Sequence, residues 1–122
     1  MVNVILSLAA NRYQKSNLAK ARQRLGEVLT NIHYTTEQWT EPLSTKRRDP
    51  YLNQLAQGQT ELGLEELNRR LKQIETDFGR TPEKRQCGIV PIDLDILQYG
   101  DQRHHERDWQ RPYVADLLGQ LQ

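Results

Sequence analysis

The order in which helical and strand-like periodicities alternate along the chain is the strongest constraint on its fold. Apolar residues alternate over residues 2–8, which predicts a first strand. Apolar residues recur at three- and four-residue intervals over 18–29 and 64–78, which predicts two helices with one buried stripe each. Further strands are predicted at 32–40, 51–62 and 90–99. The order βαββαβ indicates an α+β, ferredoxin-like fold, an antiparallel sheet with both helices on one face and long loops.

The boundaries of these elements follow from local signals. Ser16 or Asn17 could cap the first helix, and Gly79 is expected to end the second. Two polar loops of about ten residues are expected at 41–50 and 80–89. After an exposed loop at 103–112, apolar residues predict a short closing helix: Val114, Leu117, Leu118 and Leu121. At 122 residues, the chain 1–122 is expected to form a single domain.

The charge balance and the cysteine content exclude several classes of protein. With 17 basic and 16 acidic residues, the net charge of +1 argues against a nucleic-acid partner. A lone cysteine, Cys87, excludes an internal disulfide and a cysteine-based zinc site, and fits the cytoplasm, where we expect the protein. The apolar start lacks a basic region typical of a signal peptide, and no run approaches the roughly 18 apolar residues that span a membrane.

Two aspartates interrupt the last predicted strand, in the stretch VPIDLDILQY. Side chains at alternate strand positions share a face, so Ile92, Leu94 and Ile96 are expected on one side. Asp93 and Asp95 are then expected together on the other side. Two like charges at this spacing are typical either of a solvated strand face or of a site for a hard divalent cation, Mg²⁺ above all.

The two long loops supply cations that could meet phosphates at such a site. Lys46, Arg47 and Arg48 lie in the first loop, where solvated charge is an equal alternative. The second loop, with Arg80, Lys84 and Arg85, leads directly into the aspartate strand. Arginine offers a bidentate fork to a phosphate and lysine a point charge, so the second loop is the stronger candidate.

Six short motifs along the chain are informative through their order and spacing. They are AAN at 9–11, TEPL at 40–43, YLN at 51–53, Glu75 four residues before GR at 79–80, DLDIL at 93–97, and a tail with His105, Arg111 and Tyr113. Together they resemble the 6-hydroxymethyl-7,8-dihydropterin pyrophosphokinase family (2-amino-4-hydroxy-6-hydroxymethyldihydropteridine diphosphokinase). The likeness runs over nearly the whole chain, as a divergent member with a short C-terminus, and is strongest at DLDIL.

The resemblance implies an ATP- and Mg²⁺-dependent pyrophosphokinase of folate biosynthesis, which transfers pyrophosphate to the pterin and releases AMP. It implies catalytic roles for Asp93, Asp95, Arg80, Lys84 and Arg85, with the two aspartates holding two Mg²⁺ ions. It implies ATP-binding roles for Lys72, Glu75, Ile96, His105, Arg111 and Tyr113. It implies pterin-binding roles for Thr40, Pro42, Leu43, Tyr51 and Asn53. The expected partners are therefore the pterin and ATP, with no nucleic acid and no membrane, and the expected oligomeric state is a monomer.

The chain departs from the family pattern at four positions. Cys87 stands where the family has a tryptophan, Val90 and Pro82 where it has arginines, and Lys72 where it usually has glutamine. Loss of a phosphate-binding arginine removes transition-state stabilisation unless a neighbour compensates. Two alternatives therefore remain beside the enzyme: a degenerate homologue that binds nucleotide or pterin with little turnover, and a non-catalytic ferredoxin-like interaction domain.

Overall fold

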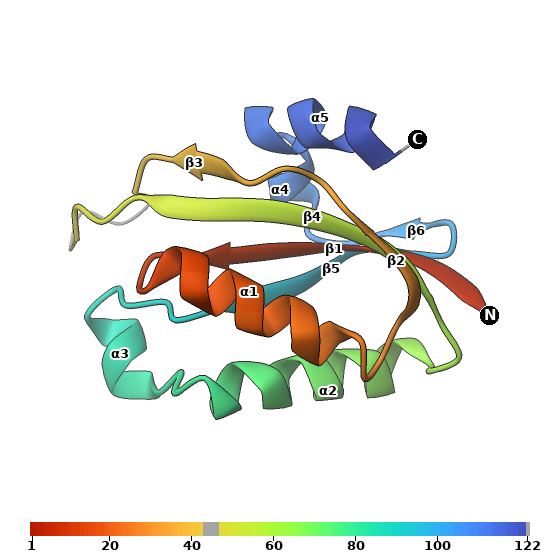
Figure 1. The fold of residues 1–122 in the computed structure, drawn as a ribbon, viewed down its shortest axis with the longest axis horizontal. Helices are drawn as coiled ribbons and strands as arrows, with labels where there is room; N and C mark the ends of the chain where they lie inside the picture. The colour runs from red at the N-terminus through yellow and green to blue at the C-terminus, as the bar shows by residue number, and fades with distance from the viewer. Residues whose placement is uncertain (43–46, 122) are drawn as a thin grey trace.

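The fold is built on a six-stranded antiparallel sheet, seen in a computed structural model that describes residues 1–42 and 47–121 (Figure 1). The strands are β1 (Val2–Ala10), β2 (Thr30–Tyr34), β3 (Gln38–Thr40), β4 (Tyr51–Thr60), β5 (Asp93–Tyr99) and β6 (Gln102–Arg103). The helices are α1 (Gln14–Leu25), α2 (Leu64–Asp77), α3 (Pro82–Gln86), α4 (Glu106–Trp109) and α5 (Pro112–Leu118), followed by the 3₁₀ turn η1 (Gly119–Leu121). The strand order is β2-β4-β1-β5-β6, and β3 also pairs with β4.

The predicted ferredoxin-like arrangement is confirmed by the central four strands and two helices. The central strands β1 and β4 pair antiparallel over nine residue pairs, and β5 pairs with the other side of β1. Both long helices cover one face of the sheet (Figure 1). Their buried residues Leu18, Leu67 and Leu71 join the main apolar core with Leu6 and Leu94. Burial of these stripes explains why each helix forms where its periodicity predicts.

The opposite face of the sheet carries the C-terminal segment. Helices α4 and α5 lie on this side (Figure 1). Tyr113, Val114 and Leu117 pack against Leu55 of β4 and Leu97 of β5 in a second apolar cluster. The closing helix is thus confirmed, and it covers the face that α1 and α2 leave open. Among the described residues, no helix is both long and apolar enough to cross a membrane.

The two faces of β5 follow the predicted alternation. Ile92, Leu94 and Ile96 belong to the main core on the α1/α2 side, while Asp93 and Asp95 are only partly exposed. The pairing of β1 with β5 shifts register between Ile5 and Leu6, so that Leu97 has no partner residue on β1. Leu97 is buried in the second cluster. The carboxylates therefore lie on the face that continues into that cluster.

Two boundaries in the first half differ from the prediction. Helix α1 begins at Gln14 after the N-cap residue Tyr13, so neither Ser16 nor Asn17 caps it. Asn17 instead donates hydrogen bonds to the carbonyls of Arg12 and Pro91. The predicted strand 32–40 is divided into β2 and β3. The Thr35 side chain accepts a hydrogen bond from the backbone N–H of Leu55, in place of a regular ladder bond.

The second half contains more helix than predicted. The loop 80–89 holds α3, capped by Thr81, whose hydroxyl accepts from the N–H of Lys84, with Pro82 in the first turn. Accordingly, β5 begins at Asp93 and not at residue 90. The tail loop 103–112 includes the four-residue α4. Gly79, with φ of +86°, follows the end of α2 as predicted.

Candidate active site

The centre of the candidate site is the contact between α2 and the outer side of β5. Glu75, only 5% exposed, accepts a hydrogen bond from the backbone N–H of Leu94 at 2.8 Å. Lys72 donates to the carbonyl oxygen of the same residue at 2.9 Å. Side chains one helical turn apart on α2 thus satisfy both polar backbone groups of one residue on β5. This contact holds α2 beside the two aspartates.

Two cations of the chain lie between the carboxylates of this region. Nη1 of Arg80 is 2.9 Å from Oε1 of Glu75 and 2.9 Å from Oδ1 of Asp93. Nζ of Lys72 is 3.0 Å from Oε2 of Glu75 and 3.2 Å from Oδ1 of Asp95. The result is a continuous network in which each aspartate is paired with one cation. Asp93 and Asp95 therefore do not form the plain solvated face considered from the sequence.

The network drives the pKa values of the two aspartates apart. Burial tends to raise the pKa of Asp93, but the charge of Arg80 and its hydrogen bond outweigh burial and lower it. Burial raises the pKa of Asp95, and the neighbouring charge of Asp93 raises it further despite Lys72. Burial also raises the pKa of Glu75. The two carboxylates of the pair are therefore shifted in opposite directions.

A cleft of about 480 Å³ opens beside this network, between α2 and α3. Its lining includes Lys72, Glu75 and Arg80 from the network and Arg85 from α3. Lys84, also on α3, extends back toward the end of α2, so that a Cβ added at Gly79 would lie 2.9 Å from its Nζ. Two of the cations predicted from the second loop, Arg80 and Arg85, thus line one cleft. The cleft is linked to the aspartates through Lys72 and Arg80, which line it and also contact Asp95 and Asp93.

The pterin-binding candidates gather at the paired ends of β3 and β4. Asn53 donates through Nδ2 to the Thr40 hydroxyl at 2.8 Å and to the Gln38 carbonyl at 3.0 Å. Tyr51 pairs with Thr40 across the two strands. Burial raises the pKa of its phenol, and the charge of Asp93 raises it further, which links this group to the aspartates. Pro42 follows this strand pair in sequence, and Leu43 lies outside the described residues, as does Lys46.

The remaining ATP-binding candidates divide between two places. Arg111 and Tyr113 line a cavity of about 320 Å³ together with Thr40, beside the pterin candidates. Burial raises the pKa of Tyr113 to about 12. Ile96 and His105 line another cavity, of about 260 Å³. His105 is also near the network, with its Nε2 3.8 Å from Oδ1 of Asp95.

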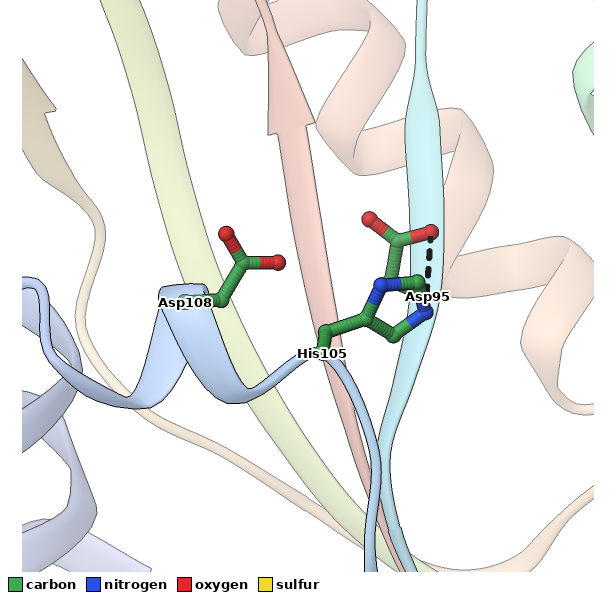
Figure 2. A group of neighbouring side chains, drawn as sticks. All are labelled: Asp95, His105 and Asp108. Carbon is green, nitrogen blue, oxygen red and sulfur yellow. Dashed lines mark ion pairs between the residues drawn. The ribbon is translucent and has the colours of Figure 1, made fainter.

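Two residues of the site were not singled out from the sequence as site residues. Asn11 is buried and exchanges hydrogen bonds with the loop before β5, from Nδ2 to the Gly88 carbonyl and from the Val90 N–H to Oδ1. Asp108 lies near both His105 and Asp95 (Figure 2). The spacing of His105 and Asp108, three residues apart, was the signal available in the sequence.

Comparison with known proteins identifies the family. Residues 5–122 match the model of the family described as 7,8-dihydro-6-hydroxymethylpterin-pyrophosphokinase (HPPK). The chain is 35% identical, over 95% of its length, to a "Folate synthesis bifunctional protein" of Arabidopsis thaliana, and covers 27% of that protein. It is 42% identical over 66% of its length to a mitochondrial protein of the same description from Pisum sativum, of which it covers 18%.

A shorter relative matches nearly the whole of the chain. This is a "2-amino-4-hydroxy-6-hydroxymethyldihydropteridine pyrophosphokinase" of Porphyromonas gingivalis, 30% identical over 99% of the chain and 91% of the relative. The chain thus spans about a quarter or less of the two plant proteins but nearly all of this bacterial one. By the match over residues 5–122, the chain belongs to the 7,8-dihydro-6-hydroxymethylpterin-pyrophosphokinase family.

Proposed function

We propose that this chain transfers pyrophosphate from ATP to 6-hydroxymethyl-7,8-dihydropterin and releases AMP, with Mg²⁺ as cofactor. The observation that carries the proposal is the pair Asp93 and Asp95, whose ion-pair partners Arg80 and Lys72 line a cleft together with Arg85. The family match over residues 5–122 supports it. Residues 1–122 would act as one domain, and as a monomer in the cytoplasm.

The donor atoms at the aspartates fit a magnesium ion. Both groups offer carboxylate oxygens, which hard divalent cations prefer, and the network keeps Asp93 in its charged form. Asp93 and Asp95 would hold the metal, which supplies positive charge to offset that of the phosphates. Lys72 and Arg80 now balance the same carboxylates, so both cations would have to share or release them when the metal binds.

The chain's own cations would position and stabilise the phosphates. Arg80 forms ion pairs with both Glu75 and Asp93, so its guanidinium is held in place in the lining of the cleft. Arg85 lines the same cleft from α3 and could supply the charge that Val90 and Pro82 do not. Fixed cations at developing negative charge lower the barrier without reorganisation during the reaction.

The pterin would bind at the ends of β3 and β4. The Nδ2 of Asn53 is already bonded to Thr40 and Gln38, which orients its amide oxygen as the acceptor for a ligand amino group. Tyr51 precedes Asn53 on the same strand, and its phenol is within the electrostatic influence of Asp93 and Arg80. This arrangement would place the hydroxymethyl oxygen of a bound pterin on the side of the aspartates.

The proposal is tested by measuring AMP released from ATP and Mg²⁺ with and without 6-hydroxymethyl-7,8-dihydropterin. We expect AMP to form only when the pterin and Mg²⁺ are both present, and an equal amount of pterin diphosphate to appear. Binding of a non-hydrolysable ATP analogue without AMP formation would instead support the degenerate homologue. Absence of both binding and turnover would leave the non-catalytic interaction domain.

Lys72, which replaces the usual family glutamine, provides a second prediction. Its half-exposed ammonium competes for Asp95, so Lys72→Gln is expected to raise the affinity for Mg²⁺. For a screened pair of this kind, the expected gain is about 0.5–1 kcal/mol, or roughly two- to fivefold in Kd. Calorimetric titration of Mg²⁺ in the presence of the ATP analogue measures it, with the exposed Lys20→Gln on α1 as the matched control. A lower affinity would mean that Lys72 holds the nucleotide.

A further inference from the structure

A second group of possible metal ligands lies next to the aspartate pair. It consists of Asp95 on β5, His105 and Asp108, each of which offers a ligand atom within 4.8 Å of the other two. Figure 2 shows the imidazole beside the carboxylate of Asp95, with Asp108 extending from α4 on the other side. Bound to zinc at about 2.0–2.2 Å, such atoms would lie closer together than they do here, so small side-chain movements would complete the site.

The first turn of α4 brings two of these ligands together. His105 is the residue before the helix, and the N–H of Asp108 donates to its carbonyl oxygen at 2.8 Å. Both side chains reach Asp95 on β5, because the ligand atoms of the three residues lie within 4.8 Å of one another. The backbone of His105 has φ of +57°, a conformation that is uncommon for a residue with a side chain, and it turns the imidazole toward Asp95.

Burial distinguishes this group from a chance surface cluster. The side chains of Asp95 and Asp108 are 16% and 21% exposed, whereas the imidazole of His105 is 47% exposed and gives access from solvent. Arg111 contacts Asp108 through Oδ1. Within residues 1–42 and 47–121, Arg111 is the one ion-pair partner of Asp108.

The chemistry of the three ligands selects a class of metal. Mg²⁺ prefers oxygen ligands in octahedral geometry, and an imidazole nitrogen is a poor ligand for it. One imidazole and two carboxylates suit borderline ions such as Zn²⁺, with solvent in the remaining position. The imidazole therefore makes this group different from the oxygen-only pair of Asp93 and Asp95.

We propose that Asp95, His105 and Asp108 form a binding site for a divalent transition-metal cation such as Zn²⁺. The ion would tie the first turn of α4 to β5 and would share Asp95 with the proposed magnesium site. Binding of this ion does not depend on pyrophosphoryl transfer. It can therefore be measured on the protein without substrates.

The test is titration of Zn²⁺ by calorimetry, and of Co²⁺ by visible absorption, with Mg²⁺ in excess. Cys87 is an exposed thiol, so every variant carries Cys87→Ser to remove a competing ligand. We expect His105→Ala and Asp108→Asn each to weaken Zn²⁺ binding at least about tenfold, and the visible d–d absorption of bound Co²⁺ to decrease in both. His33→Ala, at an exposed histidine on β2, is the matched control and is expected to bind like the parent.

Three outcomes would overturn the site. They are unchanged binding in both His105→Ala and Asp108→Asn, loss of binding in His33→Ala, and displacement of Zn²⁺ by an equal concentration of Mg²⁺. Thermal unfolding of each variant without metal identifies loss of binding through misfolding. In that case His105→Gln, which keeps polarity and approximate size but lacks the imidazole, replaces the alanine variant in the titration.

Discussion

Replacement of Asp95 by asparagine is expected to reduce pyrophosphoryl transfer at least about 10³-fold. The substitution keeps the size of the side chain but removes a negative charge from the carboxylate pair. A cation held by Asp93 alone would lose half of its proposed protein ligands, and loss of several kcal/mol of transition-state stabilisation corresponds to this factor. The measurement is the initial rate of pterin-dependent AMP formation at saturating ATP and Mg²⁺.

The fold should tolerate this substitution, so the loss of activity can be attributed to the site. Asparagine removes the repulsion between Asp95 and Asp93, and Lys72 keeps its contacts with Glu75 and the Leu94 carbonyl. The thermal midpoint is therefore expected to stay the same or to rise. Asp101→Asn, at an exposed turn, is the matched control and should retain the parental rate. Activity of Asp95→Asn within tenfold of the parent would contradict the assigned role.

Replacement of Glu75 by alanine is expected to have the largest effect on stability. The buried carboxylate accepts hydrogen bonds from the Leu94 N–H, Lys72 and Arg80, and its loss leaves Arg80 without one of its two carboxylate partners. Removing one member of a buried charge network costs about 3–5 kcal/mol, because the remaining groups stay buried without their partner. Urea unfolding measures the loss as a shift of the midpoint at constant m-value.

Two further variants separate charge from hydrogen bonding at this position. Glu75→Gln keeps an acceptor for the Leu94 N–H but removes the charge, so an intermediate loss of stability is expected. Glu65→Ala, at an exposed position in the first turn of α2, is the control and should cost less than about 1 kcal/mol. A loss below about 1 kcal/mol for Glu75→Ala would show that the network does not stabilise the contact between α2 and β5.

The sequence predicted those features of the fold that depend on periodicity alone. The apolar stripes of α1 and α2 and the alternation of Leu94 and Ile96 with the aspartates follow from burial on one side, and each is confirmed. The division of strand 32–40 depends on the Thr35 hydroxyl, which bonds to a residue twenty positions away. No local pattern contains that contact.

In the site, too, features set by neighbouring residues could be predicted from the sequence, and contacts between residues far apart in the sequence could not. The helix α3 could have been predicted, since Thr81 followed by Pro82 is a typical start of a helix. The contact of Lys72 with Asp95 could not, because it joins residues 23 positions apart. Helical periodicity gives the orientation of α2 about its axis, but it does not give the place at which α2 meets β5.

The bonds from α2 to Leu94 also occupy a part of the edge of β5 that no strand covers. Strand β6 pairs with β5 only at Gln98 and Tyr99 among the described residues, so the remainder of that side lacks a neighbouring strand. An open row of backbone groups is a template on which a strand from another molecule can pair. Glu75 and Lys72 occupy the N–H and C=O of Leu94 with charged side chains. Two residues that border the proposed nucleotide cleft thereby leave fewer free backbone groups on this edge for another strand to pair with.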